Sequence, residues 1–163
     1  MRVSDVERVM EIERESFATP WSESAYLTEI SNQSGFYVTA KLGEEVVGYA
    51  GMWIIMDEAH ITTLAVDSRY RGRKFGERLL VAILDESMAR GLRRATLEVR
   101  RSNRAAQKLY EKYSFETVAV RRGYYANNRE DALVMWINDM RSPEYVARYG
   151  TLKRRLEGYQ VSA

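Results

Sequence analysis

Cysteine is absent from the 163-residue sequence, and histidine occurs once, as His60. The lack of cysteine excludes disulfides, thiolate metal ligands and a cysteine nucleophile. A single histidine argues against a histidine-rich metal site and leaves a Ser-His-Asp triad only one base to use. No Gly-x-Ser-x-Gly segment accompanies it. We therefore expect no metal centre, and we interpret His60 as structural, with a substrate contact as the alternative.

Long apolar runs are also missing. No stretch of 18 apolar residues occurs, and the N-terminus lacks a charged segment followed by an apolar one. We therefore expect a cytoplasmic protein with no membrane span and no secretion signal. With 45% hydrophobic and 29% charged residues, the composition is typical of a globular protein with one substantial core.

Basic residues outnumber acidic residues only slightly, and the net charge is +2. That value does not argue for direct nucleic-acid binding, and we expect none. Seven acidic residues and three arginines fall in residues 1–31, whereas basic residues gather in 69–78 and 100–108. This distribution suits an anionic cofactor beside a cationic substrate, although most of these charges are more simply explained as solvated helix faces.

What the sequence does contain is an alternation of helical and extended patterns. Apolar spacing and capping residues predict helices over 4–16, about 22–32, 76–90 and 103–114. Apolar runs bounded by turn residues predict strands over 35–42, 46–55, 59–66, 94–99, 115–121 and 132–138. Two helical crossovers link the third, fourth and fifth strands, so the middle of the sheet should be parallel and its edges antiparallel. The expected fold is a mixed α/β sheet with helices on both faces.

The pattern changes after Met140, which divides the sequence into a domain over 1–140 and a tail over 141–163. Ser142 and Pro143 are typical of a helix start. An apolar stripe at helical spacing follows, formed by Tyr145, Tyr149, Leu152, Leu156 and Tyr159. We expect this amphipathic tail to pack on its own domain; docking onto a partner or RNA is the alternative.

A basic, glycine-containing loop follows the third predicted strand and reads Arg71-Gly72-Arg73-Lys74-Phe75-Gly76. Free N–H groups at the start of the next helix, together with the helix dipole, form a site for phosphate. The loop is neither a Walker loop nor a dinucleotide-binding fingerprint, and an ordinary basic turn is an equal alternative. If the Lys74 position requires a positive φ angle, the lysine is strained there.

Glu98 is a carboxylate inside an apolar strand, near the end where parallel sheets place their sites. It shares one strand face with Thr96, while Ala95, Leu97 and Val99 share the other. Burial should raise the pKa of Glu98 and make it a usable base; pairing with an arginine is the alternative.

Three further polar or aromatic residues have simple structural interpretations. Asn103 is placed to cap the helix that follows it. Tyr110 lies on the apolar face of that helix, where its hydroxyl would need a partner. Trp21 falls in the loop between the first two helices, and we interpret it as a core residue, with an exposed functional aromatic as the alternative.

Three blocks fall in an order and spacing that resemble the GNAT family of acetyltransferases. The first is Ile61-Thr62-Thr63-Leu64-Ala65-Val66-Asp67 with the basic loop, where Lys74 replaces a glycine of the family pattern. The second joins 97–106 to Leu109-Tyr110-Glu111, and the third joins 121–125 to 130–135. The resemblance covers about residues 3–140. Within the family, the blocks are similar to ribosomal-protein alanine N-acetyltransferases (RimI) and to the catalytic subunits of archaeal and eukaryotic N-terminal acetyltransferases.

The resemblance implies roles for individual residues. Glu98 would be the general base, acting directly or through water, and Tyr110 the acid that protonates the departing thiolate. The residues that would bind acetyl-CoA are Leu64, Ala65, Val66, Arg71, Gly72, Arg73, Lys74, Phe75, Gly76 and Asn103. Those that would bind the peptide N-terminus are Trp21, Tyr124 and Tyr125.

The function that the resemblance implies is direct transfer of an acetyl group from acetyl-CoA to the α-amine of a protein, with a ribosomal protein bearing an N-terminal alanine as the substrate. We expect a monomer or weak dimer. A lysine or polyamine acetyltransferase of the same fold is the first alternative. A non-catalytic acyl-CoA-binding module is the second, and the presence of both Glu98 and Tyr110 argues against it.

Overall fold

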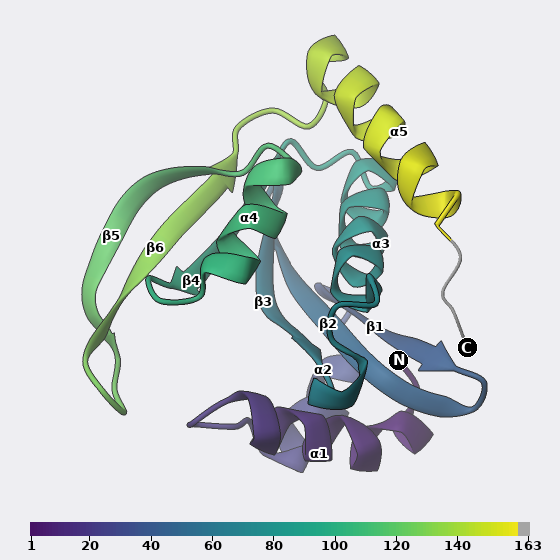
Figure 1. Ribbon diagram of the computed structural model, residues 1–163, viewed down its shortest axis with the longest axis vertical. Helices are drawn as coiled ribbons and strands as arrows, with labels where there is room; N and C mark the ends of the chain where they lie inside the picture. Colours follow the sequence, from purple (N-terminus) through teal and green to yellow (C-terminus); the bar gives the residue numbers. More distant parts are fainter. Residues whose placement is uncertain (160–163) are drawn as a thin grey trace.

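The core of the fold is one six-stranded sheet. The computed structural model describes residues 1–159. Its strands are β1 (Gly35–Leu42), β2 (Glu45–Ile55), β3 (Glu58–Val66), β4 (Arg94–Arg100), β5 (Glu116–Tyr125) and β6 (Glu130–Ile137). They lie in the order β1-β2-β3-β4-β6-β5 (Figure 1).

The sheet is mixed, as predicted, but its parallel part is small. Within residues 1–159, β3 and β4 form the one parallel pair, and the other four pairs are antiparallel. We predicted that the fifth strand would extend the parallel middle. Instead β6 folds back and inserts between β4 and β5, pairing with β4 from Ala95–Ile137 to Arg100–Ala132. The fifth strand is therefore an edge strand.

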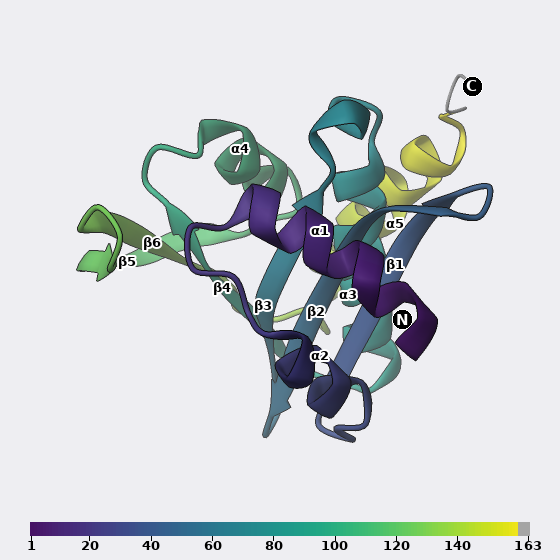
Figure 2. The same cartoon turned by 90° about the horizontal axis from the view of Figure 1, so that it is seen from below.

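Helices cover both faces of the sheet. On one face, α1 (Val6–Ser16) and α2 (Glu23–Ile30) lie across β1–β3 (Figure 2). On the other, α3 (Phe75–Ala89) and α4 (Arg104–Lys112) pack over a larger apolar core. The predicted start of the first helix at Ser4 is wrong. A short 3₁₀ turn, η1 (Val3–Asp5), precedes α1, because the Asp5 carboxylate accepts the Arg2 N–H at 2.8 Å and closes that turn.

The tail helix α5 (Pro143–Glu157) packs beside α3 (Figure 1). Tyr145, Tyr149 and Leu156 are buried in the same core as α3, which confirms that the tail packs on its own domain. The Tyr149 hydroxyl donates to Asp85 of α3 at 2.8 Å. The final tail residues, 160–163, lie outside the described part of the chain. Within residues 1–159, no helix combines the length and apolar character needed to cross a membrane.

The parallel pair β3–β4 separates part-way along its length. Its paired positions run from Glu58–Arg94 to Ile61–Leu97 and stop there. Beyond that point β3 continues to pair with β2 as far as Val66, and β4 with β6 as far as Arg100. The separation begins at an irregularity in β3: Ile61 pairs with Met52 but Thr63 pairs with Gly51, which leaves Thr62 as an extra residue. Such a bulge bends a strand and redirects the side chains beyond it.

Candidate active site

The basic loop joins the end of β3 to the start of α3. Asp67 caps a short 3₁₀ turn, η2 (Ser68–Tyr70), and the chain then reaches α3 through two left-handed residues, Gly72 (φ +77°) and Lys74 (φ +67°). A lysine in this conformation costs about 1 kcal/mol relative to glycine. The position at which the family pattern has glycine therefore does require a positive φ here, and Lys74 is strained.

A pocket of about 330 Å³ opens where the loop meets α3 and α4. Its lining residues are Val66, Tyr70, Arg71, Gly72, Lys74, Phe75, Gly76, Glu77, Ala105 and Leu109. Because the first bond of α3 runs from the Arg78 N–H to the Lys74 carbonyl, the three N–H groups before it have no partner within the helix. Unpaired N–H groups, the helix dipole and the cations of the loop together suit the phosphates of an anionic cofactor.

Glu77 forms a buried anchor beneath this pocket. Its carboxylate accepts hydrogen bonds from Lys74 (3.1 Å), from the Tyr113 hydroxyl (2.8 Å) and from Lys112. Burial opposes the charged form, but the bonds from Lys112, Tyr113 and Lys74 outweigh it and hold the pKa of Glu77 below its ordinary value. The ion pair with Glu77 fixes the strained Lys74 at the rim of the pocket.

Glu98 lies where β3 and β4 part, on the face covered by α1 and α2, and its side chain is 11% exposed. Its carboxylate is 2.9 Å from the His60 Nε2 atom and 3.3 Å from an Arg121 nitrogen. The bond from His60 lowers the pKa of Glu98; burial opposes this, and the charges of His60 and Arg121 add to the lowering. The predicted rise in pKa is therefore wrong, because the hydrogen bond from His60 and the nearby Arg121 guanidinium outweigh the desolvation. The predicted alternative, a glutamate paired with an arginine, is confirmed.

The sequence reasoning missed His60 as a partner of Glu98. In the parallel register His60 lies opposite Thr96, and Glu98 is the next residue along that face of β4. Because the ionised carboxylate is an acceptor, the His60 Nε2 atom is the donor in this bond. A histidine on one predicted parallel strand and a glutamate on the next was the available signal, but the register could not be read without the fold.

Tyr110 places a buried hydroxyl on the opposite side of the sheet, among residues of the α3–α4 core. Burial raises its pKa to about 12, with a further contribution from Tyr125. Among residues 1–159 no hydrogen bond to this hydroxyl is formed, so the predicted partner is not found in that part of the chain. A phenol that stays protonated at neutral pH and has no partner is available to donate to a bound group.

Tyr124 and Tyr125 are the last two residues of β5, which continues four residues beyond the predicted strand end at position 121. Tyr124 is 47% exposed, whereas the Arg100 guanidinium covers one face of the Tyr125 ring at 3.7 Å. Burial raises the pKa of Tyr125 to about 12, and Glu98 contributes to the rise, which places Tyr125 within electrostatic reach of both Glu98 and Tyr110.

Trp21 is half-buried, and its ring is the first of a row of three rings that ends at His60, the partner of Glu98. Its ring stacks on Trp53 at 6.0 Å, and Trp53 contacts His60 edge-on at 6.5 Å. The backbone N–H of Trp21 donates to the buried Glu13 at 2.9 Å, which fixes the loop between α1 and α2. The arrangement combines the two interpretations of Trp21, since the ring packs on the core and also borders the site.

Asn103 caps α4 as predicted, because its side chain accepts the Ala106 N–H at 3.1 Å. Leu64 and Val66 pack toward the α3 side of the sheet, while Ala65 belongs to the core under α1. The backbone of Leu64 to Val66 lies beyond the last β3–β4 pair, so β4 does not cover this edge; on it, the Val66 carbonyl accepts from the Arg71 Nε atom at 3.0 Å.

These features can be compared with known proteins. Residues 6–115 match the family described as "Acetyltransferase (GNAT) family". The chain belongs to the GNAT family. It is an acetyl-CoA-dependent N-acetyltransferase, and the chemistry of the pocket fits that donor: cations and free N–H groups for phosphates, and an open strand edge for the amide-bearing arm.

Individual relatives in this family carry a more specific name. The chain is 39% identical over 138 residues to a Bacillus subtilis protein provisionally named as a ribosomal protein bS18-alanine N-acetyltransferase, covering 84% of this chain and 91% of the relative. The Escherichia coli enzyme of that name is 35% identical over 139 residues, with 83% and 92% coverage. The crystal structure of the Escherichia coli ribosomal-protein-S18-alanine N-acetyltransferase superimposes with a TM-score of 0.78 at 31% identity, covering 88% of this chain and 94% of that one.

Proposed function

We propose that this GNAT enzyme acetylates the N-terminal α-amine of a ribosomal protein that begins with alanine. The observation that carries the proposal is the pair His60–Glu98 where β3 and β4 separate, together with a pocket suited to acetyl-CoA on the other face of the sheet. The similarity to ribosomal protein bS18-alanine N-acetyltransferases, over more than nine-tenths of their length in the cases above, supports the substrate. The proposal places the enzyme in the cytoplasm, where it would encounter such a substrate.

Glu98 is the general base in this proposal. An α-amine has a pKa near 8, so a modest base suffices to accept its proton as nitrogen attacks. The lowered pKa keeps Glu98 ionised at neutral pH, and the bond from His60 holds the carboxylate in place. The proton passes to Glu98 directly or through a water, and the negative charge also attracts the approaching ammonium group.

Tyr110 is the general acid. Its hydroxyl is protonated at working pH because burial raises its pKa to about 12. A hydrogen bond from this phenol to the departing sulfur stabilises the developing thiolate, which needs one proton to leave as a thiol.

The donor is held by the chain's own backbone and cations. The residues assigned to this role are Leu64, Ala65, Val66, Arg71, Gly72, Arg73, Lys74, Phe75, Gly76 and Asn103. When bound, acetyl-CoA supplies an activated acetyl group as a thioester. The open edge at Leu64 to Val66 binds the amide-bearing arm, the loop binds the pyrophosphate, and the Val66 N–H polarises the carbonyl that is attacked.

The acceptor peptide enters on the α1–α2 face. Trp21, Tyr124 and Tyr125 border the route to Glu98 and orient the first residues of the peptide. Holding the amine against the thioester supplies much of the rate, because positioning replaces a bimolecular encounter.

The test is acetyl transfer from acetyl-CoA to a panel of peptides, read by mass spectrometry. The panel varies the first two residues, includes blocked N-termini with free lysines, and carries spermidine as a control. We expect acetylation of free N-termini, fastest with alanine first. Transfer to lysine or spermidine alone would overturn the substrate and leave the family membership intact.

A further inference from the structure

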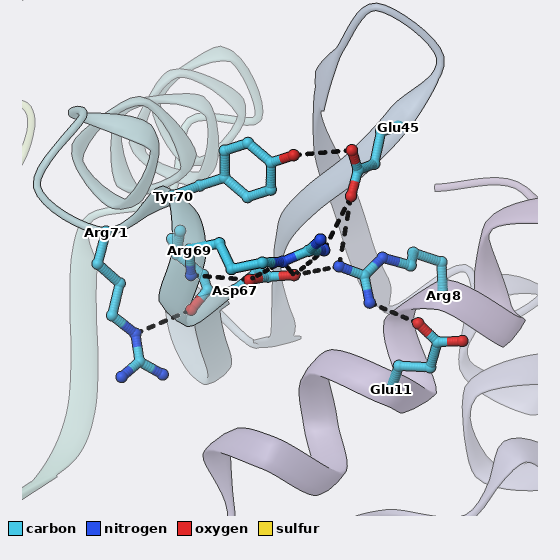
Figure 3. Close-up of polar contacts among 8 residues, drawn as sticks. Arg8, Glu11, Glu45, Asp67, Arg69, Tyr70 and Arg71 are labelled. Atoms are coloured by element: carbon cyan, nitrogen blue, oxygen red, sulfur yellow. Dashed lines mark hydrogen bonds and ion pairs between the residues drawn. The ribbon is translucent and has the colours of Figure 1, made fainter.

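A buried carboxylate stands directly behind the phosphate loop. Asp67 follows the last residue of β3 and is 3% exposed. Its carboxylate accepts the Arg69 N–H at 2.9 Å, an Arg69 guanidinium N–H at 2.8 Å and an N–H from Arg8 of α1 (Figure 3). The Asp67 N–H donates to the Val47 carbonyl at 3.0 Å. Three elements, α1, β2 and η2, therefore meet at one side chain.

A second carboxylate extends the same network. Glu45, the first residue of β2, accepts from Arg69 at 3.0 Å and from the Tyr70 hydroxyl at 2.8 Å. Arg8 also lies 3.6 Å from Glu45 (Figure 3). The first half of the loop is thus fixed from behind by Asp67, Glu45 and Arg8, whose side chains do not line the pocket.

The residues on either side of this anchor do line the pocket. Val66 precedes Asp67, and Arg71 follows η2. The Arg71 Nε atom donates to the Val66 carbonyl at 3.0 Å, so the two ends of the anchored turn are bonded to each other (Figure 3). Any shift of Asp67 must move the backbone of both residues.

Helix α1 connects this anchor to the peptide side of the site. Arg8 contacts the loop, while Glu13, on the same helix, accepts from the backbone of Trp21 at 2.9 Å and from Tyr26 at 2.8 Å. The two residues are about 7.5 Å apart along the helix axis. One short rigid element therefore contacts both the donor loop and the acceptor loop.

We propose that Arg8 and Asp67 are positioning residues for the donor: their ion pair ties the phosphate loop to α1 and holds it in the receptive shape before acetyl-CoA binds. The proposal rests on the assignment of residues 71–76 to the phosphates of acetyl-CoA. Preorganisation of this kind increases affinity, because the ordering cost is met during folding and not during binding.

The experiment compares three variants on α1 by calorimetric titration with acetyl-CoA and by steady-state kinetics. Arg8→Gln removes the charge, Arg8→Lys restores a cation, and Arg14→Gln is the control, since Arg14 is exposed on the same helix. For Arg8→Gln we expect Kd and KM for acetyl-CoA to rise about 5–10-fold, with kcat at saturation within twofold. Arg8→Lys should recover part of the loss, and Arg14→Gln should match the parent.

A merely structural role would give a different result. An unchanged Kd for acetyl-CoA in Arg8→Gln, with only a lower Tm, would overturn the proposal. Asp67→Asn, which keeps the shape and removes the charge, should show the same rise in Kd; the Arg8 series decides the matter if that variant does not fold. A parent that binds no acetyl-CoA overturns this proposal and the donor assignment together. A parent that binds it but acetylates no N-terminus overturns only the proposed function.

Discussion

At the scale of single residues, the site depends on how Glu98 is paired. The carboxylate is held ionised by His60 and Arg121, so it is a weak base with a fixed orientation. A weak base suits an amine that needs to lose its proton only as the new bond forms.

Replacing Glu98 by glutamine tests its role as the base. Glu98→Gln keeps the size and the bond to His60 but cannot accept the proton, so we expect kcat to fall about 100-fold or more. The Kd for acetyl-CoA from calorimetric titration should stay within twofold, because Glu98 does not line the donor pocket. An unchanged kcat would refute the assignment.

Removing His60 should move the pH profile. The bond from His60 is the largest cause that lowers the pKa of Glu98, so His60→Ala should let that pKa rise. The base must be ionised to act; the acid limb of kcat/KM should therefore shift to higher pH. His60→Gln can still donate a hydrogen bond and should shift it less. The measurement is kcat/KM against pH, corrected for titration of the substrate amine, and coincident acid limbs for parent and His60→Ala would contradict the prediction.

At the scale of elements, the turn into α3 combines strain with charge. Lys74 adopts a left-handed conformation that favours glycine, yet its ammonium is bonded to the buried Glu77. A cation is thereby placed at the rim of the pocket at a conformational cost of about 1 kcal/mol.

Two substitutions separate strain from charge at this position. Lys74→Gly and Lys74→Met both remove the ammonium, so both should weaken acetyl-CoA binding. Lys74→Gly also relieves the left-handed strain, and we expect it to be more stable than Lys74→Met by about 1 kcal/mol in urea unfolding. Equal free energies of unfolding for Lys74→Gly and Lys74→Met would show that position 74 does not adopt a φ angle of +67° in the free protein.

The tail helix offers a matched pair of tyrosines. The Tyr149 hydroxyl donates to Asp85 and to the Val81 carbonyl, whereas the buried Tyr145 hydroxyl has no hydrogen-bond partner among residues 1–159. Tyr149→Phe should lower the free energy of unfolding by about 1 kcal/mol. Tyr145→Phe should be neutral or stabilising, because it removes an unsatisfied buried hydroxyl. Thermal and urea unfolding measure both, and the reverse order of stabilities would refute the contacts of α5.

The sequence predicted elements well where local pattern decides. β1 has the predicted bounds, β2 and β3 begin one residue early, and Asn103 and Ser142 cap helices as expected. The start of α1 was missed, because the Asp5–Arg2 bond could not be distinguished from a Ser4 cap by spacing alone.

At the scale of the whole molecule, the contacts that decide the chemistry are long-range. Arg121 of β5 contacts Glu98 of β4 across β6, which lies between these two strands in the sheet. The insertion of β6, the extra residue Thr62 and the register that brings His60 to Glu98 depend on strand pairing, which local pattern does not encode. The candidate residues could therefore be named from the sequence, while the lowered pKa of Glu98 and its pairing with His60 and Arg121 could not.

The separation of β3 and β4 has a consequence for how the two substrates reach the site and how the products leave it. The donor pocket opens beneath α3 and α4, whereas Glu98 and His60 face α1 and α2. In the proposed mechanism, donor and acceptor therefore approach the reacting centre from opposite faces of the sheet and meet where β3 and β4 separate. Because the proposed mechanism places the two substrates on different faces, coenzyme A and the acetylated product can leave the site independently of each other. In that mechanism, the separation of β3 and β4 gives each of the two substrates its own route to the reacting centre.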